Sequence, residues 1–102
     1  MFGDKLVLLI DQFINHTDLL VGEMEAAVCE DNAEELYFKG QQFKGTSLQM
    51  GATQVGARCE QMEALAEQKQ MHTTPDLLIK LKQEVIDTNI ALTDFKQGLL
   101  SP

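Results

Sequence analysis

Proline occurs at only two of the 102 positions, Pro75 and the last residue, Pro102. Because proline interrupts the hydrogen bonding of a helix interior, a chain without it up to residue 74 can form long continuous helices. The sequence also lacks tryptophan and has a single tyrosine and few clusters of β-branched residues, so little in it favours a sheet. These features predict an all-α fold.

Apolar residues recur at the helical period in four segments of the chain. We expect these segments to form four helices, with the ranges 4–29, 33–50, 53–70 and 75–98. Short loops between long amphipathic helices force neighbouring helices to run antiparallel, which predicts an up-down-up-down four-helix bundle. A chain of this length is expected to form one domain, 1–102.

The ends of these segments carry capping residues. Asp4 is expected to cap the first helix, and the turn 30–32 to end that helix and cap the second. Gly51 is a natural stop for the second helix. Thr74 is expected to cap the fourth, with Pro75 at its first position, where a missing N–H group costs nothing.

One stripe of each helix is expected to face a common core. The expected core residues are Leu6, Leu9, Phe13, Leu20, Met24 and Ala27 in the first helix, Leu36, Gly40, Phe43, Ser47 and Met50 in the second, Val55, Cys59, Met62 and Ala66 in the third, and Leu78, Leu81, Val85, Leu92 and Phe95 in the fourth.

Composition excludes several classes of function. The net charge of -8 argues against nucleic acid or an anionic membrane as a partner, because no basic stripe exists to neutralise phosphates. No segment approaches the length and apolarity of a membrane span. Cys29 and Cys59 stand alone without nearby His or Cys, which indicates buried, reduced thiols in the cytoplasm and no metal site. No phosphate-binding loop, nucleophile elbow or Glu-x-x-His pair occurs, so we expect neither an enzyme nor a cofactor.

The most informative stretch runs from Gln41 to Glu63 and reads QQFKGTSLQMGATQVGARCEQME. Gln41, Lys44, Gly45 and Leu48 share one face of a helix at this spacing. Lys44 can offer an ammonium to phosphate oxygens. Gly45 lets another protein approach the helix closely, or alternatively permits contact with a neighbouring helix, although glycine costs about 1 kcal/mol there.

This stretch resembles the signature of histidine-containing phosphotransfer (HPt) domains, a histidine followed by x-(Leu/Phe)-Lys-Gly-(Ser/Thr)-Ser, then Gly-Ala and, on the next helix, a Cys and an acidic residue. The residues in register with that signature are Phe43, Lys44, Gly45, Thr46, Ser47, Gly51, Ala52, Cys59 and Glu63. The flanking helices are similar to those of the family as well. The resemblance implies a role in two-component phosphorelay, with a response-regulator receiver domain as the partner and a hybrid sensor kinase as a further candidate.

The chain departs from the family at the reactive position, where Gln41 stands in place of the phosphorylated histidine. A glutamine amide delocalises its nitrogen lone pair into the carbonyl and is not a useful nucleophile. The resemblance therefore implies a protein that docks receivers through Gln41, Lys44, Gly45 and Leu48 but has no catalytic residue. A natural pseudo-phosphotransfer protein and a His→Gln variant of an active carrier both fit.

Other possibilities remain open. His16 is expected to lie level with about Thr46, beside the core, and His72 in the loop before Pro75, so neither replaces the missing histidine convincingly. Glu63 and Glu67 are expected near the site, where carboxylates would repel a phosphate. The alternative function is a structural or oligomerising helical bundle with no phosphorelay role.

Overall fold

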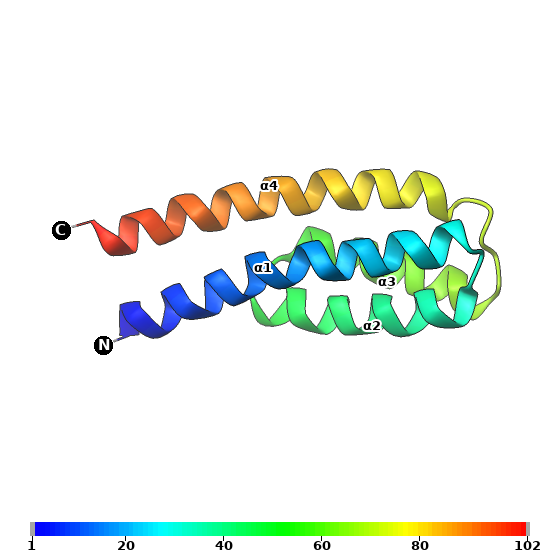
Figure 1. Cartoon of the computed structure of the whole chain (residues 1–102), viewed down its shortest axis with the longest axis horizontal. Helices are drawn as coiled ribbons and strands as arrows, with labels where there is room; N and C mark the ends of the chain where they lie inside the picture. The colour runs from blue at the N-terminus through cyan, green and yellow to red at the C-terminus, as the bar shows by residue number, and fades with distance from the viewer. Residues whose placement is uncertain (1, 102) are drawn as a thin grey trace.

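Four helices account for nearly all of the protein. The computed structural model describes residues 2–101, so Met1 and Pro102 of the expected 1–102 domain lie outside the described part. The helices are α1 (Phe2–Cys29), α2 (Ala33–Gln49), α3 (Thr53–Glu67) and α4 (Thr74–Leu100), and they alternate in direction as an up-down-up-down bundle (Figure 1). The described residues contain no strand. The predicted fold class is therefore confirmed.

Each helix packs against two neighbours. Helix α1 contacts α2 and α4, and α3 also contacts α2 and α4, whereas the diagonal pairs make no contact within residues 2–101. Ion pairs join all four of these interfaces. They link Lys39 to Glu23 (α2–α1, 2.5 Å), Lys44 to Glu63 (α2–α3, 3.0 Å), Arg58 to Glu84 (α3–α4, 2.8 Å) and Lys96 to Asp11 (α4–α1, 2.8 Å). The helix order around the bundle thus follows the chain order.

Two of the turns between helices form where the capping residues predicted them. The side chain of Asn32 accepts a hydrogen bond from the backbone N–H of Glu35 at the start of α2. Gly51 follows α2 with a φ of +79°, a conformation that glycine adopts without strain. The turn 30–32 and the stop at Gly51 are confirmed.

Two predicted caps are wrong. Helix α1 already includes Phe2, so Asp4 lies inside its first turn rather than at the cap. Helix α4 begins at Thr74, and the residue before it, Thr73, occupies the cap position without a side-chain hydrogen bond. The hydroxyl of Thr74 instead donates to the carbonyl oxygen of Met71 inside the bundle, where Thr74 is fully buried.

The core contains most of the predicted residues. Those confirmed as buried are Phe13, Leu20, Met24, Ala27, Leu36, Gly40, Phe43, Ser47, Val55, Cys59, Met62, Ala66, Leu78, Leu81 and Val85. Leu6, Met50 and Leu92 are half-buried. The core assignment of Leu9 and Phe95 is wrong, because their exposed fractions are 52% and 54%. Ile10 and Thr17 are buried instead, although neither was predicted.

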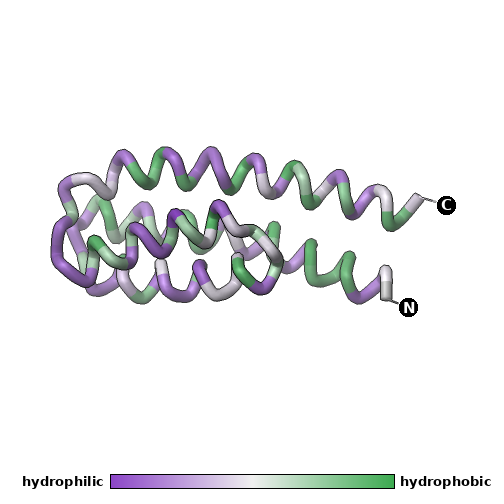
Figure 2. Tube along the Cα trace, turned by 180° about the vertical axis from the view of Figure 1, so that it is seen from behind, coloured by the Kyte–Doolittle hydropathy of each residue, from purple (hydrophilic) through white to green (hydrophobic). Residues whose placement is uncertain are grey.

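The helices differ in length, and this difference shapes the molecule. Helices α1 and α4 have 28 and 27 residues, whereas α2 and α3 have 17 and 15. At about 1.5 Å per residue, the first pair extends roughly 16 Å beyond the second. The excess lies at one end, where both termini protrude past the turn between α2 and α3 (Figures 1 and 2). Leu9 and Phe95 are exposed because they lie on this extension.

Candidate functional site

The outward face of α2 carries the residues expected to form the site. Gln41, Gly45 and Leu48 are all exposed, on the side of the helix opposite the buried Leu36 and Phe43. Leu48 has an exposed fraction of 55%. The Asn32 cap and the Gly51 turn bound this helix, so the core stripe of α2 fixes which residues point outward.

The two glycines of α2 have different environments. A Cβ atom at Gly40 would lie 3.5 Å from the carbonyl oxygen of Cys59 and 3.6 Å from Cβ of Glu63, so Gly40 lies in the close α2–α3 contact. A Cβ atom at Gly45 would meet no atom of residues 2–101 within 4 Å. Packing within the protein therefore explains the first glycine but not the second.

Lys44 does not extend freely toward solvent. Its ammonium lies 3.0 Å from Oε2 of Glu63 on α3, and the two side chains are 27% and 13% exposed. The neighbouring Glu63 carboxylate raises the pKa of Lys44. The expected repulsion of a phosphate by Glu63 is accordingly reduced, while Glu67 remains exposed one turn further along α3.

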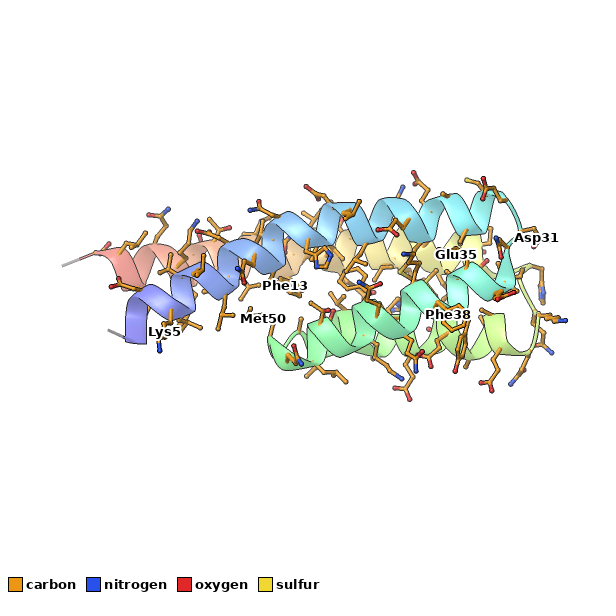
Figure 3. All side chains as sticks on the ribbon, turned by 60° about the horizontal axis from the view of Figure 1, so that its bottom comes forward. Lys5, Phe13, Asp31, Glu35, Phe38 and Met50 are labelled. Atoms are coloured by element: carbon orange, nitrogen blue, oxygen red, sulfur yellow. The ribbon has the colours of Figure 1, made fainter. Side chains whose placement is uncertain are left out.

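Two exposed apolar side chains border this face and were missed from the sequence. Phe38 on α2 is 54% exposed and makes an edge-to-face contact with Tyr37, with ring centroids 5.5 Å apart. Leu19 on α1 is 58% exposed. It lies one turn before Glu23, whose ion pair with Lys39 marks the α2-facing side of α1. Figure 3 shows where α1 and α2 lie side by side and labels Phe38.

Neither histidine lies on the outward face of α2. His16 on α1 lines a cavity of about 450 Å³ together with Thr46, which confirms the predicted level of this residue in the bundle. His72 lies in the loop between α3 and α4, at the opposite end. Both side chains are exposed. The structure therefore brings neither imidazole into the position of Gln41.

The other chemistry-bearing residues of the described part of the chain do not form a metal site. Within residues 2–101, no three His, Cys, Asp or Glu side chains gather in a geometry that could hold a metal ion. No helix of that part of the chain is long and apolar enough to cross a membrane. Cys59 is buried as predicted, and desolvation raises its pKa to about 12. Cys29, by contrast, is exposed near the end of α1, so its predicted burial is wrong.

One comparison with known proteins gives the family, and another gives a similar fold. The family model of the Hpt domain matches residues 8–90 of the chain, well over half of it. The fold is similar to the crystal structure of histidine-containing phosphotransfer protein B (HptB) from Pseudomonas aeruginosa PAO1, with a TM-score of 0.90 at 24% sequence identity. That match covers 93% of this chain and 83% of the other. Among curated proteins, none matches the sequence.

Proposed function

The chain belongs to the Hpt domain family, and from this premise we propose that it docks receiver domains without carrying phosphate at Gln41. HPt domains are phosphocarrier modules of two-component phosphorelays rather than enzymes, and their partners are response-regulator receiver domains.

The open space at Gly45 is the observation that carries the docking site. Glycine inside a helix costs about 1 kcal/mol relative to alanine, and no atom of the described residues lies close enough to Gly45 to require it. A partner that comes close to the helix backbone would require it. Gln41 lies one turn before Gly45 and Leu48 about one turn after it, so a docked receiver would cover all three.

The side chain of Gln41 suits contact rather than chemistry. Its amide can donate and accept hydrogen bonds, so it can replace the contacts of an imidazole at a docked surface. It offers no nitrogen lone pair to attack an aspartyl phosphate. A receiver docked on α2 would therefore keep its phosphate, and the chain would occupy the receiver without relaying the signal.

The surroundings of α2 supply two further features of a transient interface, exposed apolar side chains and basic charge. Leu19, Phe38 and Leu48 provide exposed apolar contact on both sides of the glycine. Lys39 and Lys44 are the basic residues of α2, and both face carboxylate partners that raise their pKa values, Glu23 and Glu63 respectively. Their charge suits the acidic pocket of a receiver domain. For a transient interface of this kind we expect a Kd of about 1–100 µM.

The position of Gln41 fits either a natural pseudo-phosphotransfer protein or a His→Gln variant of a carrier. A hybrid sensor kinase, through its attached receiver domain, is a second partner. The cytoplasm is the proposed compartment, which the two unpaired cysteines of the described residues support. Membership of this family favours a role in phosphorelay over the rival function, a structural or oligomerising bundle outside phosphorelay.

The test is binding to a panel of receiver domains from the organism that encodes the chain, measured by titration calorimetry. Gly45→Arg places a long side chain over the docking face, and we expect it to weaken binding by about tenfold or more with unchanged helicity. Gln83→Arg is the matched control, since it adds the same charge to α4, which does not contact α2 in the described structure. Undiminished binding of Gly45→Arg would refute the docking face.

A further inference from the structure

The protruding ends of α1 and α4 form a two-helix extension that lacks the other half of the bundle. Along most of the molecule α2 and α3 cover the inner faces of α1 and α4, but both end at the turn around Gly51. Beyond that turn, α1 continues to its first residues and α4 to its last (Figure 1). The inner face of this extension therefore has no partner within residues 2–101.

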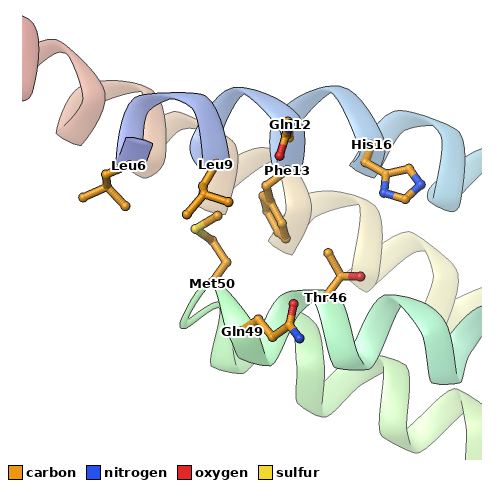
Figure 4. A pocket seen from close by; sticks show the side chains of 8 residues that line it. All are labelled: Leu6, Leu9, Gln12, Phe13, His16, Thr46, Gln49 and Met50. Carbon is orange, nitrogen blue, oxygen red and sulfur yellow. The ribbon is translucent and has the colours of Figure 1, made fainter. Parts of the chain in front are cut away.

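That inner face is apolar and continues the core. On α1, Leu6 and Leu9 extend the stripe that contains the buried Phe13. On α4, Leu92, Phe95 and Leu99 extend the stripe that contains the buried Val85. Figure 4 shows the side chains of Leu6 and Leu9 pointing from α1 toward the space beside Met50, and Figure 2 shows hydrophobic stretches along the protruding part of α1.

Polar contacts between the two helices of the extension lie on its flank and fix its shape. Lys96 of α4 pairs with Asp11 of α1 at 2.8 Å. Deeper in the bundle, the amide of Asn89 donates to the hydroxyl of Thr17 at 3.0 Å. These contacts hold α1 and α4 together while their apolar inner face stays open. The extension is thus a preformed surface, because little ordering is needed before something packs on it.

We propose that a second copy of this chain completes the bundle by packing its own extension on this face. The extension is half a four-helix bundle, about 16 Å long, and what it lacks is two antiparallel helices of that same length. A copy related by a two-fold axis across the long direction of the bundle brings those two helices. The two extensions then overlap side by side and antiparallel, with Phe95 close to Phe95 of the other copy.

The helix dipoles at the two junctions favour this arrangement. The start of α1 in one copy would follow the end of α2 in the other, near Met50, so a helix N-terminus would meet a helix C-terminus. The end of α4 would likewise precede the start of α3, near Thr53. Helix dipoles aligned head to tail attract each other, and both junctions have this favourable order.

Cavities mark both junctions. The space of about 450 Å³ that Leu6, Leu9 and Met50 help to line would receive the first turn of α1 from the second copy. A second space of about 260 Å³, bordered by Ala52, Thr53 and Leu92, would receive the last turn of α4. An extension of this size buries roughly 1,000 Å² between two copies, near the lower limit for specific interfaces, so we infer a weak dimer.

Sedimentation equilibrium of the full chain, from about 5 to 500 µM, tests the proposal. We expect the average mass to rise from 11.4 kDa toward twice that value with increasing concentration. Leu9→Glu and Phe95→Glu should each weaken the dimer about tenfold or more. Because Leu9 and Phe95 are exposed, neither substitution should disturb the fold of the monomer, and circular dichroism checks this. Ile79→Glu, at an exposed isoleucine of α4 outside the extension, is the matched control and should leave the dimer intact.

A disulfide trap tests the two-fold geometry separately. In a Cys29→Ser background, Phe95→Cys should yield a disulfide-linked dimer under mild oxidation, whereas Ile79→Cys should remain monomeric. A chain that stays monomeric at 500 µM, glutamate variants that dimerise like the parent, or equal cross-linking of both cysteine variants would each overturn the proposal. None of these outcomes bears on receiver docking, because the docking face on α2 is a different surface.

Discussion

The ammonium of Lys44 on α2 lies 3.0 Å from a carboxylate oxygen of Glu63 on α3. The pair connects the outward face of α2 to the helix behind it and determines how much of the lysine charge a docked partner can use. Because the carboxylate raises the pKa of Lys44, the pair stabilises the fold fully below the ordinary lysine pKa of 10.5. That contribution is lost as the pH rises through the raised value.

Glu63→Gln is expected to strengthen receiver binding by roughly twofold to fivefold, because it frees the charge of Lys44 for the acidic receiver pocket. Titration calorimetry at low and high salt measures the change, which should shrink as salt screens it. Glu67→Gln removes the same charge from an exposed position of α3 and is the control. Equal gains in both variants would mean that only net charge matters, contrary to this expectation.

The two glycines of α2 should respond oppositely to added side chains. Gly45→Ala is expected to raise the free energy of unfolding by about 1 kcal/mol, because alanine favours the helix and its Cβ meets open space. Gly40→Leu is expected to lower it by about 1–3 kcal/mol through overpacking against α3. Urea denaturation measures both. A destabilising Gly45→Ala would show that this glycine has a packing role after all.

The buried thiol of Cys59 is expected to make the protein less stable at alkaline pH. Burial raises its pKa from 9.0 to about 12, so the unfolded chain releases the thiol proton first. The stability linked to this neutral thiol is complete below pH 9 and falls between pH 9 and 12, by at most about 1.4 kcal/mol per pH unit. Urea denaturation of the parent and of Cys59→Ala at pH 7, 9 and 10 should show a steeper decline in the parent. The exposed Cys29, replaced by serine, should leave the slope unchanged.

Substitutions of Phe38 and Phe43 are expected to have different effects, the first on receiver docking and the second on folding stability. Phe43 is fully buried, and Phe43→Ala should lower the free energy of unfolding by about 3–5 kcal/mol. Phe38 is more than half exposed, so Phe38→Ala should change stability by less than about 1 kcal/mol but weaken receiver binding several-fold. Thermal unfolding and calorimetry together provide the comparison. Normal receiver binding by Phe38→Ala would remove this residue from the proposed surface.

The helices and most of the core were predictable because the apolar period of each segment is strong. The errors on Leu9 and Phe95 have one cause. Periodicity shows which side of a helix faces the bundle, but it does not show where the neighbouring helices end. Both residues lie on the correct stripe, beyond the ends of α2 and α3. For the same reason, the sequence did not predict the two-helix extension.

The site was predictable as a helix face but not in its contacts. Spacing alone put Gln41, Gly45 and Leu48 on one side of α2, and all three are exposed there. The engagement of Lys44 with Glu63 depends on how closely α2 and α3 approach, which Gly40 permits and which no local pattern specifies. Exposed Phe38 could have been found, since a large apolar residue off the core stripe is a signal for a contact surface.

The most direct test of the central claim is phosphoryl transfer from phosphorylated receiver domains to the parent chain and to Gln41→His. We expect the parent to bind receivers but remain unlabelled, and Gln41→His to acquire label, because an imidazole at this position can attack the aspartyl phosphate. Gln42→His, with a histidine one residue further along the same helix, should stay unlabelled. Labelling of the parent, or a Gln41→His variant that neither binds receivers nor accepts phosphate, would contradict the claim.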